Sequence, residues 1–221
     1  MEDEPEATPP ESGFTLRKID RAKAHTSSKP PTPAQRVERL PPGQHLTTKW
    51  PVLDLGVEPA IRHEEWTLSI EGSSKGGVSL TWHDFLDLPQ TAIRSDIHCV
   101  TAWSRYDNDW DGIATTDLLA AYPPLSDRTH VVLGSSDGYT TNLALADFAH
   151  HQAMLAHSWA GDLLTREHGG PVRAVVPHLY LWKSAKWLKR ITFQTEEHLG
   201  YWEVRGYHRR GDPWNEERYS D

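Results

Sequence analysis

A chain of 221 residues with a hydrophobic content of 37% can fill the core of one large domain or two small ones. Lysine and arginine number 23 against 31 aspartate and glutamate residues, so the formal net charge of −8 excludes a general polyanion-binding surface, and nucleic acid is not expected as a partner. The single cysteine, Cys99, excludes an internal disulfide framework and every zinc site that needs two or more thiolates.

Residues 1–42 are predicted to form a disordered tail. Eight of the 16 prolines precede Gly43, and the apolar residues among them are too few to offset the entropy of ordering. The acidic segment from Met1 to Pro10 lacks the basic and apolar regions of an export signal, and no run reaches the roughly 18 to 20 apolar residues that cross a bilayer. We therefore expect a cytoplasmic protein with no membrane partner and one folded domain over residues 43–221.

The first elements of this domain are two strands and a short helix. Apolar and polar residues alternate over 66–71, which predicts a half-buried strand, and a glycine-rich turn joins it to a second strand over Val78–Trp82. Thr81 and Asp84 have the spacing of a capping box that starts a short helix, and Pro89 ends it.

The later elements alternate irregularly between strand and helix. A second short helix is expected to start near Thr115 or Thr116 and to stop before Pro123, and Asp137–Gly138 predicts a hairpin turn. Further strands are expected over Ile93–Val100, His130–Leu133, Tyr139–Leu143, Pro171–Val176 and Trp187–Phe193. Without a fixed-period repeat or regular strand–helix alternation, the pattern predicts an α+β class with mixed β-sheets and short helices.

Three motifs that resemble functional sites are set aside. The segment Glu71–Gly77 lacks the spacing and the Gly-Lys-Ser/Thr ending of a phosphate-binding loop. His168–Pro171 resembles an esterase oxyanion loop, but the chain has no Gly-x-Ser-x-Gly motif to act with it. His150, His151 and His157 are interpreted as one face of a solvated helix, because no His-Glu-x-x-His motif accompanies them.

Cys99 has three interpretations. It ends an apolar strand, follows His98 and precedes an aromatic and polar stretch, Thr101–Trp110. A lone cysteine is commonly a small buried hydrophobic residue. It also acts as a nucleophile when a histidine base activates it, or as a single thiolate ligand of a transition metal when a cofactor supplies the other sulfur ligands. The residues alone leave all three open.

Two late segments contain groups that suit a phosphate or a polar heterocycle. His168–Arg173 supplies an imidazole, two glycines and a guanidinium, and Ser184–Lys186 adds a hydroxyl and an ammonium group. In an acidic protein such a set can hold an anion through charge-assisted bonds. Pairing of these cations with surface carboxylates is the alternative.

Tryptophan is unusually frequent, with ten residues that cluster in the last two thirds of the chain. Large aromatic side chains line cofactor and substrate clefts. They also fill cores, so the sequence does not separate the two roles.

Several separated motifs together resemble the molybdopterin-binding domain of the sulfite oxidase family, in its small, single-domain bacterial branch. The resemblance runs from Thr47 to about Tyr207, and it implies the mixed-sheet fold of that family. The motifs that carry it are Asp96–Ser104, Asp137–Tyr139, His168–Arg173, Pro177–Trp187 and Tyr201–Tyr207.

The resemblance implies that molybdopterin and molybdenum are the cofactors and that Cys99 is the protein's thiolate ligand of the metal. It places Tyr207 where the family carries an active-site tyrosine that hydrogen-bonds substrate and helps to move a proton. The residues that match the family's pterin and phosphate contacts are Thr48, Lys49, Ser135, His168, Arg173, Ser184, Ala185 and Lys186.

Two positions depart from the family's sulfite-binding arginines, because Thr47 and Ser104 occupy them. Arg105 stands one place farther along and is expected, with Arg205 as the alternative, to address the substrate. The sequence also lacks the haem-binding domain of animal enzymes and the dimerisation domain. A separate electron carrier protein or a small acceptor is therefore expected.

These observations predict a molybdenum-dependent oxidoreductase that carries out two-electron oxygen-atom transfer on a small substrate, sulfur-containing substrates included. The direction of transfer is not specified by the residues. The alternatives are a cysteine-nucleophile hydrolase or transferase that uses Cys99, and a pterin-binding module without catalysis.

Overall fold

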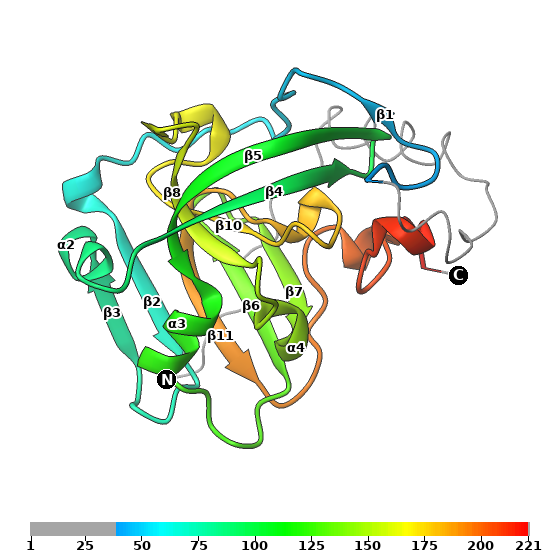
Figure 1. Cartoon of the computed structure of the whole chain (residues 1–221). Helices are drawn as coiled ribbons and strands as arrows, with labels where there is room; N and C mark the ends of the chain where they lie inside the picture. Colours follow the sequence, from blue (N-terminus) through cyan, green and yellow to red (C-terminus); the bar gives the residue numbers. More distant parts are fainter. Residues whose placement is uncertain (1–38, 221) are drawn as a thin grey trace.

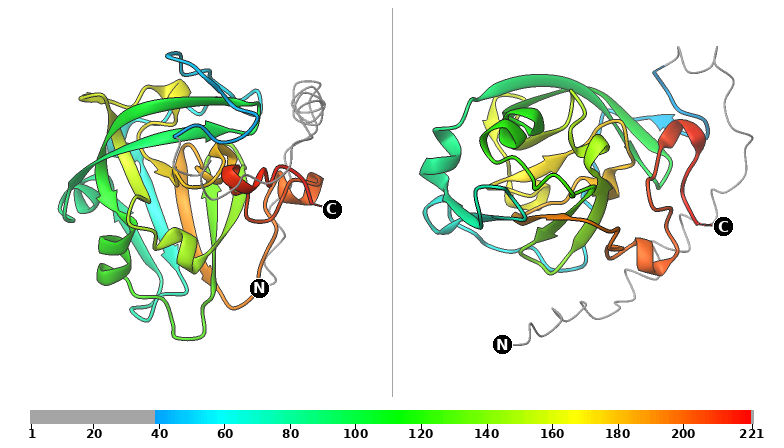
Figure 2. Two further views of the ribbon diagram at one scale, coloured as in Figure 1. Left: turned by 45° about the vertical axis from the view of Figure 1, so that its right-hand side comes forward. Right: turned by 90° about the horizontal axis from the view of Figure 1, so that it is seen from below.

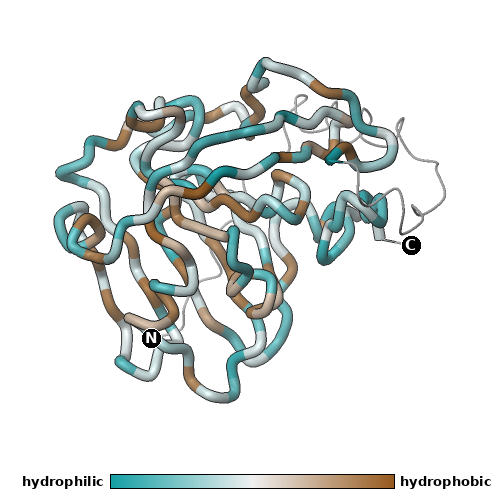
Figure 3. The backbone as a smooth tube through the Cα atoms, viewed as in Figure 1, coloured by the Kyte–Doolittle hydropathy of each residue, from teal (hydrophilic) through white to brown (hydrophobic). Residues whose placement is uncertain are grey.

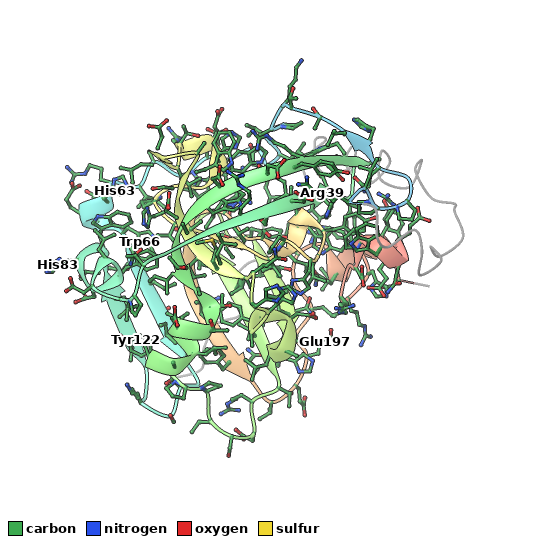
Figure 4. All side chains as sticks on the ribbon, viewed as in Figure 1. Arg39, His63, Trp66, His83, Tyr122 and Glu197 are labelled. Atoms are coloured by element: carbon green, nitrogen blue, oxygen red, sulfur yellow. The ribbon has the colours of Figure 1, made fainter. Side chains whose placement is uncertain are left out.

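Two β-sheets and several short helices form the part of the chain that this computed structural model describes, residues 39–220 (Figure 1). Most of the predicted tail lies outside the described residues. Arg39 is described, and its guanidinium pairs with Asp96 at 2.6 Å and with Asp107 at 2.8 Å, near the turn end of a long hairpin (Figure 4). Packing against the domain therefore begins at least four residues before Gly43.

The first sheet is built on a long hairpin of strands β4 and β5, which curves across the upper part of the molecule (Figure 1). The strand order is β1-β5-β8-β10, with β4 also paired to β5 and β9 to β8. The β1–β5 pair is parallel and the others are antiparallel. The strands are β1 His45–Leu46, β4 Thr91–Cys99, β5 Trp103–Ala114, β8 Met154–Trp159, β9 Asp162–Leu163 and β10 Arg173–Val175.

The second sheet has the order β3-β2-β11-β6-β7, and its β2–β11 pair is parallel. Both sheets are thus mixed and the helices are short, which confirms the predicted fold class. The strands are β2 Thr67–Glu71, β3 Val78–Thr81, β6 His130–Ser135, β7 Thr140–Ala144 and β11 Leu188–Gln194. The helices are α2 Trp82–Leu86, α3 Thr115–Ala121 and α4 Leu145–Phe148, with single turns η2 His63–Glu65, η3 Arg166–His168, η4 Leu181–Lys183, η5 Glu203–Arg205 and η6 Pro213–Asn215.

Local signals placed several of these elements correctly. Thr81 N donates to the Asp84 carboxylate at 2.8 Å and Asp84 N donates back to the Thr81 hydroxyl at 3.3 Å, so the predicted capping box starts α2. Helix α3 starts at Thr115 as expected. The Asp137–Gly138 turn joins β6 to β7, with Gly138 at φ 84°, a conformation that favours glycine.

Four strands of the first sheet, β1, β5, β8 and β9, were not predicted. Strand β5 is rich in Asp and Asn, residues that disfavour strands, but pairing with β4 along its length and with β8 holds it extended. The expected helical face of histidines is wrong: His157 lies in strand β8, and His150 and His151 lie in the turn after α4. Strand β8 pairs with β5 on one side and β10 on the other, and this pairing holds the segment around His157 extended although its histidine spacing suggested a helix.

One hydrophobic cluster joins the inward faces of both sheets, with Leu68, Leu133 and Ile191 from the second sheet and Ile97 and Leu155 from the first. The hydrophobic stretches lie mainly along the strands, and most connecting loops are hydrophilic (Figure 3). Among residues 39–220, no helix has both the length and the apolar character needed to cross a bilayer.

The segment after β11 returns along the molecule and packs beside the end of the β4–β5 hairpin (Figure 2). A fully buried ion pair fixes it there, with Lys183 Nζ 2.6 Å from the Glu203 carboxylate and both side chains at 0% exposure. The same carboxylate accepts hydrogen bonds from the Trp182 indole at 3.0 Å and the Thr141 hydroxyl at 3.1 Å. Glu203 therefore joins β7, η4 and the C-terminal segment.

Replacing Glu203 by alanine should leave the Lys183 ammonium buried without its counter-ion and lower the free energy of unfolding by about 3–5 kcal/mol. Urea denaturation followed by tryptophan fluorescence measures the loss. Glu65→Ala is the matched control, because Glu65 pairs with Arg62 where both side chains are exposed, and such an ion pair contributes about 0–1 kcal/mol. Equal losses in the two variants would contradict this account.

Candidate active site

A cavity of about 850 Å³, counting its open mouth, lies where the two sheets and the C-terminal segment meet. It brings together residues from the 50–55 loop, the β4–β5 turn, the β6–β7 turn and the 167–187 region. Seven of the residues expected from the sequence line it: Cys99, Ser135, His168, Arg173, Ser184, Lys186 and Tyr207.

Cys99 is held at the end of β4 by contacts on its backbone and its sulfur. The Gln44 side chain donates to its carbonyl at 3.1 Å, and the buried Arg218 guanidinium donates to the next carbonyl, that of Val100. The Thr101 hydroxyl lies 3.1 Å from Cys99 Sγ. Only 4% of Cys99 is exposed, so the sulfur is presented to the cavity in a fixed position.

Arg173 carries a buried positive charge that carbonyl groups surround. Its guanidinium donates to the carbonyls of His168 at 2.9 Å, Ser184 at 3.2 Å and Ala174 at 3.3 Å. Burial lowers the pKa of Arg173 to about 10, so it remains a cation at neutral pH. None of the ion pairs within residues 39–220 gives it a carboxylate partner, so the cavity wall provides an electrostatic site for an anion.

Lys186 adds a second cation to this wall, and His168 adds a neutral polar ring. The His168 ring stacks on Trp50 with 3.8 Å between centroids and 6° between planes. Burial, reinforced by the charges of Arg173 and Lys186, lowers the pKa of His168 to about 4, so its imidazole is neutral at pH 7. Gly169 is required beside them, because a Cβ there would lie 2.8 Å from Cβ of Lys186.

Ser135 supplies a polar atom that the protein itself does not satisfy. Its side chain is 1% exposed, and its hydroxyl has no hydrogen-bond partner among the described residues. Ser184, by contrast, accepts from the Val176 amide at 2.9 Å. The cavity thus contains a hydroxyl without a partner, an uncompensated guanidinium and a thiol. These three groups fit a ligand that presents a polar ring, a phosphate and a sulfur-bound metal.

The other wall of the cavity is aromatic. The Tyr207 ring packs edge-on to Trp182 at 5.1 Å and tilted against Trp202 at 4.9 Å. The Tyr139 hydroxyl donates to the Trp182 carbonyl and fixes that side chain. Burial raises the pKa of the Tyr207 phenol well above its usual range, so it is a neutral hydrogen-bond donor at physiological pH.

Five of the ten tryptophans line the cavity: Trp50, Trp103, Trp182, Trp187 and Trp202. Trp66 and Trp110 instead fill the core, at 2% and 1% exposure. Thr101 and Tyr139 are further lining residues that the sequence did not single out. Spacing gives no signal for them, because their role depends on which turns meet at this end of the sheets.

Four expected residues are not brought to the cavity. Thr48 and Lys49 are exposed, and Ala185 is buried with its carbonyl bonded to the Ala174 amide at 2.8 Å. Arg105 projects outside, where it donates to the Thr48 carbonyl at 3.2 Å and to Asn108 and lies 4.6 Å from the Trp159 ring. Arg205, the alternative, donates to the Tyr201 carbonyl at 2.8 Å and does not line the cavity.

The sequence profile described as "Oxidoreductase molybdopterin binding domain" matches residues 55–202, which span the β-sheets and most of the cavity. The chain belongs to this family. Its cofactor is accordingly molybdopterin in the molybdenum-bearing form, and the predicted family is confirmed.

Individual relatives show how far the likeness extends. The chain is 43% identical over 183 residues to "Uncharacterized oxidoreductase YuiH" of Bacillus subtilis (strain 168), covering 82% of this chain and 92% of that protein. It is 26% identical over 207 residues to the catalytic subunit of the protein-methionine-sulfoxide reductase MsrP of Ralstonia nicotianae, covering 83% of this chain and 62% of that one.

Mitochondrial sulfite oxidase of Homo sapiens is 32% identical over 108 residues, 44% of this chain and 20% of the human protein. Among solved structures, the sulfane dehydrogenase SoxCD of Paracoccus pantotrophus superposes with a TM-score of 0.57 at 18% identity, covering 63% of this chain and 40% of that one. This match confirms the fold. The chain spans less than two thirds of MsrP, sulfite oxidase and the SoxCD chain.

Lys186→Ala and Arg173→Met should each weaken cofactor binding about tenfold or more, because a charge-assisted hydrogen bond contributes about 1.5–3 kcal/mol. Pterin fluorescence after oxidative release measures the cofactor content of the purified protein. Arg62→Ala is the matched control, since Arg62 is an exposed cation paired with Glu65. Full cofactor content in both cavity variants would refute an anion-binding role for this wall.

Acid should destabilise the cofactor-free protein through His168. Between pH 6.5 and 4 the unfolded side chain binds a proton that the folded one does not, so stability falls as the pH decreases through this interval. His168→Gln removes that proton uptake and should reduce the dependence of the unfolding free energy on pH, while His98 and His150, whose pKa values burial also lowers to about 4, keep part of it. Urea denaturation at successive pH values tests this, and parallel curves for the two proteins would exclude it.

Proposed function

We propose that this protein is a molybdenum-dependent oxidoreductase that transfers an oxygen atom, with two electrons, to or from a small sulfur-containing substrate. The observation that carries the proposal is the placement of the Cys99 sulfur in the same cavity as the uncompensated Arg173 cation. When bound, the cofactor would supply a metal centre that changes oxidation state by two electrons as the oxygen atom is transferred.

The chain's own residues divide into a binding set and a reacting set. Arg173 and Lys186 would hold the phosphate, and the hydroxyls of Ser135 and Ser184 and the neutral His168 ring would orient the polar part of the cofactor. Cys99 would be the thiolate ligand, and its clamped backbone would keep the sulfur in place without rearrangement. Thr48, Lys49, Ala185 and Arg105 are left out of this set because none of them lines the cavity.

Tyr207 would act on the substrate. Its neutral phenol donates a hydrogen bond to an oxygen atom at the reacting position and can exchange a proton there. The rings of Trp182 and Trp202 fix the phenol and exclude water from that side. Positioning and proton exchange are therefore the protein's share of the chemistry.

The substrate favoured by this geometry is neutral. The basic side chains that line the cavity within residues 39–220 are Arg173, Lys186 and His168, which form the cofactor-binding wall. The lining near Cys99 and Tyr207 consists of uncharged groups, among them Trp103 and Trp182. A dianion such as sulfite would lack compensation there, so a neutral sulfur compound is the better candidate.

Electron supply and cellular location are part of the same proposal. A separate carrier protein or small acceptor would exchange electrons with the site, and the net charge of −8 favours a basic docking partner. We also propose a cytoplasmic location. Activity in fractionated cells with added carriers tests both points.

Molybdenum quantification on protein from molybdate-supplemented cells, paired with turnover assays, tests the proposed function. Loaded protein should contain the metal, and Cys99→Ser should abolish turnover and alter the sulfur-to-metal charge-transfer absorbance while keeping the fold. A fully reconstituted protein without molybdenum, or unchanged turnover in Cys99→Ser, would overturn the proposal.

An alkylating reagent distinguishes the two alternatives. A ligating Cys99 should resist labelling until the cofactor is removed, whereas a cysteine nucleophile should react in the purified protein as isolated. A non-catalytic pterin-binding module would show the same protection but no turnover with any oxygen-atom donor or acceptor.

A further inference from the structure

The hydroxyl group of Thr101 has the Cys99 sulfur as its hydrogen-bond partner. The two atoms, Oγ1 and Sγ, lie 3.1 Å apart. Both side chains line the cavity, although only 7% of Thr101 and 4% of Cys99 is exposed. Within residues 39–220 this hydroxyl makes no other hydrogen bond. A buried hydroxyl therefore stands directly beside the single thiol of the chain.

The backbone carbonyls next to this hydroxyl are engaged by other donors. The Cys99 carbonyl accepts from the Gln44 side chain at 3.1 Å and from the Ala102 amide at 3.0 Å, which occupies both of its lone pairs. The Val100 carbonyl accepts from the buried Arg218 guanidinium. With these carbonyls engaged, the Thr101 hydroxyl is directed to the sulfur, which is a weaker acceptor.

The turn that joins β4 to β5 fixes the two side chains relative to each other (Figure 1). Ala102 in this turn has φ 69°, a left-handed conformation that residues with a Cβ rarely adopt. The His45 amide of β1 donates to the Ala102 carbonyl at 2.9 Å, and Arg218 holds Val100 from the C-terminal segment. Two distant segments thus maintain a conformation that is locally unfavourable, as is common at functional sites.

Metal binding at Cys99 determines the direction of the hydrogen bond. In the free thiol either atom can be the donor. A thiol that binds a metal loses its proton, so the thiolate only accepts and the Thr101 hydroxyl must donate. A hydrogen bond to an ionised acceptor is stronger than a neutral one, and the separation of 3.1 Å places the donor in reach without rearrangement.

We propose that Thr101 is a positioning residue that donates a hydrogen bond to the Cys99 thiolate and so sets how strongly this sulfur donates electrons to the metal. The role rests on the proposed function, in which Cys99 is the thiolate ligand. A donor directed at a ligating sulfur places partial positive charge beside it, which withdraws electron density from the sulfur and favours the reduced form of the centre. Thr101 thereby raises the reduction potential of the bound cofactor.

A neutral donor suits this end of the cavity. In the proposed function the cations of the cavity wall, Arg173 and Lys186, hold the cofactor. The Thr101 hydroxyl lowers the electron density on the sulfur without adding a charge to the reacting end. The site therefore stays suited to a neutral sulfur substrate while the electronic character of the thiolate is adjusted.

Thr101→Val tests this role in the molybdenum-loaded protein, because it replaces the hydroxyl by a methyl group of similar size. The sulfur-to-metal charge-transfer band should move to longer wavelength, since a thiolate without the hydrogen bond is a stronger electron donor. The equilibrium constant for reduction by a mediator should fall about tenfold, which corresponds to about 30 mV for a two-electron couple. Spectroelectrochemical titration measures both the band and the potential.

Two further variants separate this role from a loss of packing. Thr101→Ser keeps the hydroxyl and should keep the band and the potential of the wild type. Thr115→Val is the matched control, because Thr115 is buried, does not line the cavity and donates to the Ala153 carbonyl at 3.1 Å, so neither readout should change. A wild-type band and potential in Thr101→Val, or the same shifts in Thr101→Ser or Thr115→Val, would overturn the role and leave the proposed function intact.

A vibrational readout needs neither metal nor turnover. Because the chain has one cysteine, the S–H stretching band of the cofactor-free protein reports the Cys99 sulfur alone. The band should shift in Thr101→Val, which loses the hydroxyl contact, and stay in place in Thr101→Ser, which keeps it. An unshifted band in Thr101→Val would show that the contact does not exist and would end the proposal. Reconstituted wild-type protein without molybdenum would instead overturn the proposed function, and this role with it.

Discussion

The buried charge of Arg173 is the constraint to which the rest of the site responds. A carbonyl oxygen accepts from each of its three nitrogens without neutralising its charge, and the ring centroids of Trp50 and Trp110 lie 5.3 and 5.9 Å from the guanidinium carbon. A cation held in this way keeps its field directed into the cavity. Lys186 adds to that field and His168 stays neutral beside it, so an anionic ligand completes the electrostatics of this wall.

The reacting end of the cavity is built in the opposite way, from rings and uncharged polar groups. Tyr207, Trp182 and Trp202 form one packed unit, and the Glu203 carboxylate ties this unit to the interior through Lys183. In the proposed function, charge recognition of the cofactor falls to the wall that holds Arg173, and recognition of the substrate by shape and hydrogen bonding falls to the wall that holds Tyr207. The separation explains how a protein without arginines at the family's sulfite-binding positions keeps a coherent site.

The C-terminal segment links stability to chemistry. Arg218 holds the Val100 carbonyl beside Cys99, Glu203 neutralises Lys183, and Tyr219 contacts Tyr207. These residues are close in sequence but reach three different parts of the wall. Because one segment serves all three, loosening it would move the thiol and the phenols together, and its sequence carries functional as well as structural constraints.

Much of the fold and the site could be predicted from local sequence. The capping box at Thr81, the Asp137–Gly138 turn and the α+β class follow from side-chain chemistry that acts within a few residues. The motifs from Asp96 to Tyr207 identified the family, and seven of the residues expected from the sequence line the cavity. Strand β5 and the strand that carries His157 could not be predicted, because pairing with distant strands holds them extended against their local preference.

The sequence by itself determined which chemical groups are present: one thiol, a cluster of cations, many indoles and the phenol of Tyr207. Only the tertiary structure decided which of them meet. In the folded chain Arg105 donates to Asn108 and the Thr48 carbonyl and does not line the cavity, the Ser135 hydroxyl has no partner among the described residues, and the Tyr219 ring packs edge-on against Tyr207. The physical reason is that side-chain chemistry is encoded locally, whereas direction, burial and partnership depend on contacts between segments far apart in the chain.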